Sequence, residues 1–274
     1  MKAGLRHGWL GLALIAVFWP LNWLLPGMRT HLLFFPLWLG YVLAVDGLVL
    51  RRRGSSPLTR SPRAFALLFL ASAPIWWLFE LFNLRLKNWE YLGREQFSDL
   101  EYFLLASLSF STVLPAVLCS AELFRSTRWI ERFAQGPRLA YTPARGRAYA
   151  LTGLVLLAAM LIWPRYGYPF VWMWGVFALD PLLARLGRRS FARDLERGDW
   201  RPWVSLWAGG LLCGFFWELW NVASYPKWIY HVPFVDFARV FEMPALGYLG
   251  YLPFAMELWL LAQLMFPRGP RVEL

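Results

Sequence analysis

Apolar residues dominate eight stretches of the chain, and short runs rich in charged residues, proline or glycine separate them. Each stretch is close to the roughly 17–25 residues that a helix needs to cross a bilayer. The pattern predicts an all-α, polytopic membrane protein with about eight transmembrane helices in a single membrane domain, residues 1–274. The predicted spans are 8–25, 31–50, 64–84, 100–124, 148–165, 168–187, 203–224 and 238–266.

Composition strengthens the membrane interpretation. Hydrophobic residues make up 58% of the chain and charged residues 16%, and the mean hydropathy is +0.41. Soluble domains are less apolar and carry about 25% charged residues. Lys2 and Arg6 precede the first apolar stretch as in a signal peptide, but that stretch continues without a small-residue cleavage site. We therefore expect a retained first helix.

Basic residues are distributed unevenly over the connections between the predicted spans. Of the 28 Lys and Arg residues, 21 lie before the first span, after the last span, or in the second, fourth and sixth connections. The positive-inside rule then places both termini in the cytoplasm and the protein in the cytoplasmic (inner) membrane. The net charge of +11 reflects this topology and not nucleic-acid binding, because no basic soluble domain holds the arginines.

The two halves of the sequence resemble each other. The run from Phe79 to Asn83 aligns with the run from Trp217 to Asn221, 138 positions later, and Pro115 aligns with Pro253 at the same offset. We expect two tandem four-helix repeats, 8–126 and 148–266. An even number of spans per repeat makes them parallel, related by an axis along the membrane normal. Chance similarity between helices rich in Trp and Leu is the alternative.

Two carboxyl–amide pairs lie inside the predicted spans. Glu80 with Asn83 and Glu218 with Asn221 are three residues apart, which puts each pair on one helical face. Ionisable side chains are costly inside a membrane and are functional candidates by default. Alternatively, the pairs mark helix ends at the membrane interface, flanked by a belt of aromatic residues.

Two further carboxylates bracket the last predicted span. Glu242 and Glu257 lie on either side of Pro244 and Pro253, and prolines free backbone carbonyls that need a partner helix, a water molecule or a cavity. Glu257 is expected to lie deep in the bundle, with either a functional or a structural role.

Asp46 and Asp180 have a structural interpretation. Both end predicted spans beside arginine clusters, so we expect salt bridges at the cytoplasmic face.

Few other residues indicate a known chemistry. His231 is an interfacial histidine, and with His7 and His31 it does not form a metal triad, so no metal site is expected. Cys119 and Cys213 lie in apolar runs without a CxxC pattern and are expected to be small core residues. Nucleotide-binding, zinc-protease and serine-hydrolase motifs are absent from the sequence, and no cofactor is expected.

Aromatic residues are unusually frequent, with 18 Trp, 22 Phe and 11 Tyr. Part of this aromatic surface could line a cavity for a long apolar ligand, where rings would stabilise a carbocation by about 0.5–2 kcal/mol each. Interfacial anchoring and bulky packing are the alternative explanation for the same residues.

One segment resembles a known family. The run from Phe241 to Pro253 leads into an aromatic span with Glu257, which is similar to the Gly-Tyr/Ile-x-Pro turn and acidic span of the small flavin-free integral-membrane lycopene cyclases. Trp217-Glu218 and Asn221 also resemble that family, as do the two similar helical units. The family has adjacent carboxylates soon after the proline, whereas this chain has a single Glu four residues after Pro253. The membrane carotenoid hydratases match equally well.

The resemblance implies acid catalysis on a long apolar substrate such as a polyene, an isoprenoid or a lipid. A buried Glu218 would protonate an alkene, Asn221 would orient it, and Glu80 or Glu242 would be the opposing carboxylate. Ring closure or water capture would then quench the cation. The candidate catalytic residues are Glu218, Asn221, Glu80, Asn83, Glu242 and Glu257, and the candidate substrate-binding residues are Trp217, Trp220, Trp228, Tyr230, His231, Tyr248 and Tyr251.

Two other classes of function fit the same pattern. A non-enzymatic binder or transporter would use the Glu and Asn pairs to hold a lipid headgroup or a small amphiphile at the seam between the repeats. A scaffold subunit would present its Trp-rich face to a partner membrane protein, or to a second copy of the chain. A closed, Trp-lined cavity would favour the enzyme, and a water-filled passage would favour the transporter.

Overall fold

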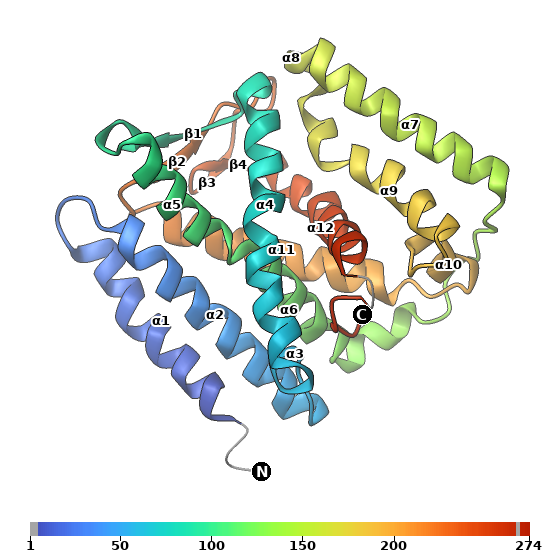
Figure 1. Ribbon diagram of the computed structural model, residues 1–274, viewed down its shortest axis with the longest axis horizontal. Helices are drawn as coiled ribbons and strands as arrows, with labels where there is room; N and C mark the ends of the chain where they lie inside the picture. The colour runs from blue at the N-terminus through green and yellow to red at the C-terminus, as the bar shows by residue number, and fades with distance from the viewer. Residues whose placement is uncertain (1–4, 267–268) are drawn as a thin grey trace.

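The computed structural model describes residues 5–266 and 269–274, which fold into a bundle of helices with two small β-ladders (Figure 1). Its helices are α1 (Arg6–Leu24), α2 (Thr30–Arg53), α3 (Pro57–Arg60), α4 (Pro62–Leu86), α5 (Asp99–Phe110), α6 (Val113–Arg125), α7 (Pro143–Ile162), α8 (Pro164–Gly167), α9 (Trp174–Arg185), α10 (Phe191–Glu196), α11 (Arg201–Asn221) and α12 (Tyr251–Met265). Its strands are β1 (Trp89–Leu92), β2 (Lys227–Tyr230), β3 (Arg239–Val240) and β4 (Met243–Pro244).

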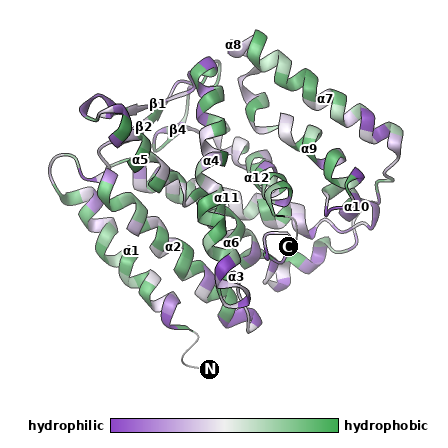
Figure 2. Ribbon diagram, in the orientation of Figure 1, coloured by the Kyte–Doolittle hydropathy of each residue, from purple (hydrophilic) through white to green (hydrophobic). Residues whose placement is uncertain are grey.

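Six helical segments are long and apolar enough to cross a membrane, counted over the described residues. Apolar residues cover these helices along most of their length, while hydrophilic residues gather in the connections (Figure 2). The molecule is therefore a helical membrane protein. The six segments are α1, α2, α4, Asp99–Arg125, α7 and Ala245–Met265.

The remaining two predicted spans are not among these six segments. The stretch predicted at 168–187 begins with a 3₁₀ turn over Tyr168–Trp172, and the α-helix that follows, α9, has only 12 residues. The stretch predicted at 203–224 forms α11, which has 21 residues. The last predicted span begins later than expected, because residues 239–244 form the β3–β4 ladder and Ala245–Gly250 a 3₁₀ turn before α12.

Three pairs of packed helices lie next to one another across the molecule (Figure 1). In Figure 1, α1 and α2 lie together at one end, α6 and α11 cross the centre, and α7 and α9 lie together at the other end. Glycine permits the closest of these contacts: a Cβ at Gly11 would lie 2.4 Å from the backbone of Ala44, and one at Gly209 2.5 Å from that of Ala121. Small residues at such positions let membrane helices approach closely.

Asp46 and Asp180 differ from their predicted role, and within the described residues neither pairs with an arginine. Asp46 accepts the Ser56 hydroxyl at 2.6 Å and the Leu58 N–H at 3.0 Å, at the start of α3. Asp180 accepts two backbone N–H groups, from Phe191 and Ala192 at the start of α10. Free N–H groups at a helix start favour such a carboxylate, so both aspartates position short helices in the connections.

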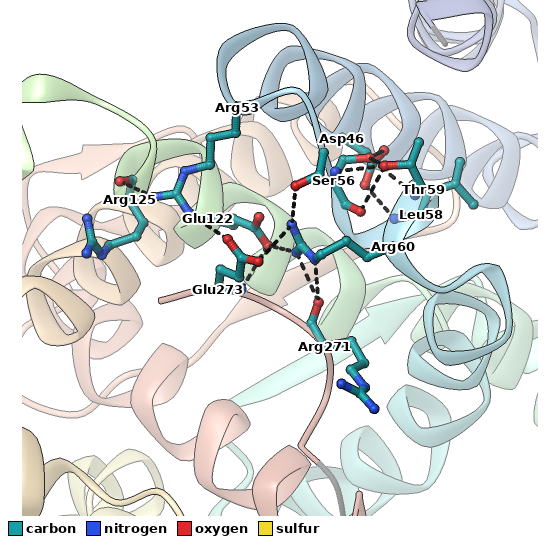
Figure 3. Close-up of polar contacts among 11 residues, drawn as sticks. Asp46, Arg53, Ser56, Leu58, Thr59, Arg60, Glu122, Arg125, Arg271 and Glu273 are labelled. Atoms are coloured by element: carbon teal, nitrogen blue, oxygen red, sulfur yellow. Dashed lines mark hydrogen bonds and ion pairs between the residues drawn. The ribbon is translucent and has the colours of Figure 1, made fainter.

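The chain end returns to the bundle beside α3 and α6 (Figure 3). Arg60 donates to the buried Glu122 carboxylate at 2.6 Å and to the Arg271 carbonyl at 3.0 Å. The Glu273 N–H donates to the same Glu122 oxygen at 3.0 Å, and the Val272 side chain is buried. A buried carboxylate thus joins two helices to the final segment.

Candidate functional site

A two-stranded ladder joins the two halves of the chain beyond the ends of α4 and α11. Strands β1 and β2 are antiparallel, with Trp89 opposite Tyr230 and Tyr91 opposite Trp228. Side chains alternate along a strand, so these four aromatic residues share one face. On the other face, Glu90 is exposed and its carboxylate lies 2.9 Å from His231. One face of the ladder is therefore aromatic and turned inward.

Glu80, near the end of α4, accepts three hydrogen bonds on one carboxyl oxygen. The donors are the indole N–H groups of Trp76 at 2.8 Å and Trp89 at 3.0 Å, and the Tyr91 hydroxyl at 2.6 Å. Trp76 is one helical turn before Glu80, whereas Trp89 and Tyr91 come from β1. The helix and the strand after it thus close around a single carboxyl group.

Glu218, near the end of α11, has a matching environment. Its Oε1 accepts the Tyr230 hydroxyl at 2.6 Å and the Tyr251 hydroxyl at 2.8 Å. The Trp228 indole donates to the Tyr230 oxygen at 2.8 Å. Glu218 is fully buried, and its Oε2 has no hydrogen-bond partner among the described residues. The carboxyl group is held by neutral donors at one oxygen only.

Two asparagines fix the strands that carry these tyrosines. The Asn221 amide donates to the Trp228 carbonyl at 2.7 Å and accepts the Trp228 N–H at 3.0 Å. The Asn83 amide likewise donates to the Trp89 carbonyl at 2.8 Å and accepts the N–H groups of Asn88 and Trp89. An asparagine side chain can replace a strand partner in this way. Each asparagine is a positioning residue that sets where its strand leaves the helix.

The side chains around the two carboxyl groups line one cavity of about 190 Å³. Neither Glu80 nor Glu218 reaches its surface, because the tyrosines and tryptophans that bond them form the wall. The wall is mostly aromatic, comprising Phe34, Trp76, Trp89, Tyr91, Phe97, Tyr102, Phe110, Trp172, Trp217, Trp228, Tyr230 and Tyr251.

Among the described residues, no Lys or Arg side chain pairs with Glu218. The candidate cations Lys227 and Arg239 lie in the connection between α11 and α12, and both pair with Glu242, at 2.5 Å and 4.0 Å. Burial raises the pKa of Tyr230 well above its ordinary value, and the Glu218 carboxyl raises that pKa further. The pKa of Tyr91 is raised in the same way by burial and by Glu80. Both hydroxyls therefore keep their protons and act as donors.

The structure brings together part of the predicted site. Trp217, Trp228, Tyr230 and Tyr251 line the cavity as expected for substrate-binding residues, and Glu80 and Glu218 lie directly behind its wall.

Other predicted site residues lie elsewhere. Trp220 packs on Trp38 at a ring distance of 5.0 Å, and the Tyr248 hydroxyl bonds the Val240 carbonyl at 3.2 Å. His231 is on the face of the ladder turned away from the cavity, and Glu242 is in the connection between α11 and α12.

Glu257 is buried, as expected, at the contact between α12 and α9. Its carboxyl lies against the start of α9, where a Cβ on Gly175 would be 2.1 Å from Oε1. Neither oxygen of Glu257 has a hydrogen-bond partner within the described chain, and it does not line the cavity. Its surroundings do not connect it to the Glu80 and Glu218 groups.

Sequence reasoning missed Trp76, Trp89 and Tyr91 as site residues. The signal that could have found two of them is a Trp-x-Tyr pattern, present at Trp89 and again at Trp228, each a few residues after a carboxyl–amide pair. Alternation with period two indicates a strand whose same-face residues act together. Among the described residues, no three His, Cys, Asp or Glu side chains gather as a metal-binding group.

No family model, no curated protein and no solved structure matches the chain. The likeness to the lycopene cyclases therefore rests on the residues that carry it, and the function must be argued from the site itself.

Proposed function

We propose that this protein is an integral-membrane enzyme that isomerises or cyclises an unsaturated hydrocarbon by adding one proton and removing another. One observation carries the proposal: the side chains that hydrogen-bond Glu80 and Glu218 in the described chain all line one aromatic cavity. Two proton-handling groups, one from each half of the chain, therefore serve the same cavity. An isoprenoid or polyene chain is the ligand class that such a wall suits.

Proton donation would use a glutamic acid and the tyrosine in front of it. The Tyr230 and Glu218 oxygens are 2.6 Å apart, close enough for a proton to move between them. With Glu218 protonated, the bond is reversed: the carboxyl O–H donates to the Tyr230 oxygen and the tyrosine hydroxyl turns to the cavity. As the Tyr230 O–H bond breaks and a C–H bond forms on the alkene, the Glu218 proton moves to the tyrosine oxygen. Tyr230 is then the catalytic residue that touches substrate, and Glu218 is the proton store behind it.

The aromatic wall would stabilise the carbocation that results. Trp89, Trp217 and Trp228 line the cavity, and each ring facing a desolvated cation contributes up to about 2 kcal/mol. Among the described residues, those that line the cavity include no carboxylate, so the cation is not trapped as an ester.

The second carboxyl group would complete the reaction. A neighbouring carbon of the cation loses its proton to Tyr91 and Glu80, whose oxygens are also 2.6 Å apart. The new C=C bond takes the electron pair of the broken C–H bond. One proton is gained and one is lost, so substrate and product have the same elemental composition. Exchange with solvent then returns a proton to Glu218 and removes one from Glu80 before the next turnover.

The arrangement around the site supports two tandem parallel repeats. Asn83 and Asn221 each donate to the Trp carbonyl of the strand that follows, and Glu80 and Glu218 each accept the Tyr hydroxyl of that strand. In the same way, Asp46 and Asp180 each hold a short helix. We propose four spans in each repeat, with α9 and α11 as spans of the second, and the cavity at the seam. With both termini cytoplasmic, the ladder then lies on the outer side of the inner membrane.

A second candidate is a binder of anionic amphiphiles. His31, Arg94 and Lys227 also line the cavity, and they could hold an anionic headgroup while the aromatic wall holds a chain. A scaffold subunit, alone or with a partner membrane protein, has no comparable observation in its favour. Glu→Gln substitutions at positions 80 and 218 separate enzyme from binder, since a binder retains its ligand without converting it.

The cavity itself can be tested with a bound molecule. Ala106 lines the cavity and Ala158 is exposed on α7, so Ala106→Trp fills the site and Ala158→Trp is a matched control. Protein purified from its own cells should carry a hydrocarbon compound that mass spectrometry detects in the wild type and in Ala158→Trp. Its loss in folded Ala106→Trp supports the proposal, and equal amounts in all three proteins contradict it.

A further inference from the structure

Helix α5 separates the cavity from an apolar groove on its other side. Its residues Tyr102, Leu105, Ala106 and Ser109 line the cavity. Its residues Leu104, Ser107 and Leu108, with Ser111 directly after its end, line a groove of about 620 Å³. Both sets follow the helical spacing i, i+3, i+4, i+7, so each occupies one side of the same helix. A single helix is thus the wall between two apolar spaces.

The groove opens to the hydrocarbon face of the bundle. Helix α2 contributes Phe35 and Leu39, and α4 contributes Phe65, Ala66, Phe69, Leu70 and Ala73. On its rim, Leu70 is 71% exposed and Leu104 is 57% exposed. Exposed apolar side chains on a membrane protein face lipid chains. A lipid-dissolved molecule can therefore reach the groove without passing through water.

The attachment of α5 is limited. Phe110 is the one buried residue among its 12. The Trp77 indole on α4 donates to the Ser107 hydroxyl at 2.9 Å and stacks on Phe103 at a ring distance of 5.3 Å. Helices with few buried contacts lie at the low-stability end of a fold. Trp77 and Ser107 form a latch between α4 and α5.

A break in the helix ends α5. Ser72 of α4 accepts the Leu114 N–H at 2.9 Å and donates to the Phe110 carbonyl at 2.5 Å, on either side of Ser111 and Thr112. Ser72 thus links the last turn of α5 to the first turn of α6, at the point where the backbone hydrogen bonds of the helix are interrupted. Such a break gives α5 a hinge at one end and the latch along its length.

From these contacts we infer that the groove between α2, α4 and α5 binds the hydrocarbon chain of a membrane-dissolved substrate, which passes around α5 into the cavity. The inference rests on the proposed function for the nature of the substrate, but not for the route. A chain of lipid-like chemistry is the occupant because the groove is apolar, faces lipid and is separated from the cavity by α5 alone.

The route is tested by labelling a cysteine in the cavity, which needs no turnover. In proteoliposomes of phosphatidylcholine, Ser109→Cys should react with lipid-soluble pyrene maleimide much faster than with a charged, membrane-impermeant maleimide. The native Cys119 and Cys213 are fully buried, and the parent protein measures their background. Filling the groove with Ala73→Trp should slow the pyrene reaction at least about tenfold, which corresponds to roughly 1.4 kcal/mol of barrier. Ala158→Trp on the α7 surface should leave the rate unchanged.

A second variant changes the rate in the opposite direction. Ser107→Ala removes the latch and should speed the pyrene reaction while the charged maleimide stays slow, which distinguishes a looser α5 from an unfolded protein. Rapid labelling of folded Ser109→Cys by the charged reagent, or a pyrene rate unaffected by Ala73→Trp, would overturn the route. Because labelling is independent of catalysis, a protein without the proposed chemistry can still give the expected rates.

Discussion

Buried carboxyl groups in this protein have different partners, and the partner indicates the role. Glu218 is met by tyrosine hydroxyls, Asp180 by backbone N–H groups and Glu122 by an arginine. Charged or strong donors favour a fixed, ionised carboxylate. Neutral hydroxyl donors allow either protonation state, which is what a group that gives and takes protons requires. Of these groups, Glu218 is the one whose partners line the cavity.

At Asn221 the expected effect of substitution is structural. Asn221→Ala removes both hydrogen bonds to the Trp228 backbone and leaves that N–H and carbonyl unpaired in a mostly buried place. Each unpaired buried group costs about 1–3 kcal/mol. We expect a lower melting temperature in detergent. Asn83→Ala, which disturbs the matching strand, should have a similar effect, and unchanged melting of both variants would contradict the positioning role.

Asp194, on α10 in a connection, gives a prediction about pH. Burial raises its pKa from 3.8 to about 6. An acid whose pKa is higher in the folded than in the unfolded protein binds more protons when folded, so stability falls as pH rises from about 4 to about 6 and stays lower above it. Asp194→Asn removes this loss, which is at most about 3 kcal/mol for that shift. Melting should be raised at pH 8 and little changed at pH 4, and equal gains at both would contradict the assignment.

At the scale of elements, short irregular segments position the long helices and the site. The β1–β2 ladder carries the tyrosines to the carboxyl groups, and α3 and α10 are fixed by aspartates from α2 and α9. The segment 269–274 is fixed by Arg60 and Glu122 (Figure 3). Specific hydrogen bonds fix where these segments lie, and buried apolar side chains such as Phe191 in α10 and Val272 in the final segment anchor them.

Arg60 should be important for the attachment of the final segment. Arg60→Ala leaves the Glu122 carboxylate buried without its cation and removes the bonds to the Arg271 carbonyl. Breaking a buried ion pair costs about 3–5 kcal/mol. Thermal unfolding in detergent should show a clear loss of stability, whereas Arg63→Ala, at an exposed arginine three residues away, should behave as the wild type. Equal stability of the two variants would contradict the role of Arg60.

At the scale of the whole molecule, the proposed eight-span topology makes a prediction about access. Glu95, beside the ladder, and Arg138, between α6 and α7, are both exposed. In intact cells, a membrane-impermeant maleimide should label Glu95→Cys, and Arg138→Cys should react only after the membrane is opened. The reverse pattern would contradict both the positive-inside assignment and the outer position of the cavity.

Apolar length and matched polar residues predicted much of this architecture. The boundaries of α1, α2 and α4 lie within a few residues of the predicted spans, because a long apolar run has few other solutions in a membrane. The pairing of Glu80 with Asn83 and of Glu218 with Asn221 indicated two helix ends that the structure places beside the same cavity. Strands of four residues, such as β1 and β2, are too short for a periodic signal, and their pairing depends on the contact between the two halves.

The contacts of the remaining residues depend on parts of the chain that are distant in sequence. Asp46 and Asp180 were expected to bind arginines that are near in sequence, yet backbone donors lie closer in space. Tyr248 and Trp220 are as aromatic as Trp228, and only the path of the chain places them outside the cavity. At these positions, tertiary packing decides how deeply a side chain is buried and which way it points, and the local sequence pattern does not.

The central claim is that Glu80 and Glu218 move protons to and from one hydrocarbon without adding or removing atoms. Its most direct test compares lipid extracts from cells in which the protein naturally occurs, carrying either the wild type or the double variant Glu80→Gln/Glu218→Gln. Loss of general acid–base groups slows such steps by about 10²–10⁴-fold each. High-resolution mass spectrometry should find an unsaturated compound that accumulates in the variant and a depleted compound of identical elemental composition. Unchanged extracts from cells with folded variant protein, or a pair of compounds that differ in composition, would contradict the claim.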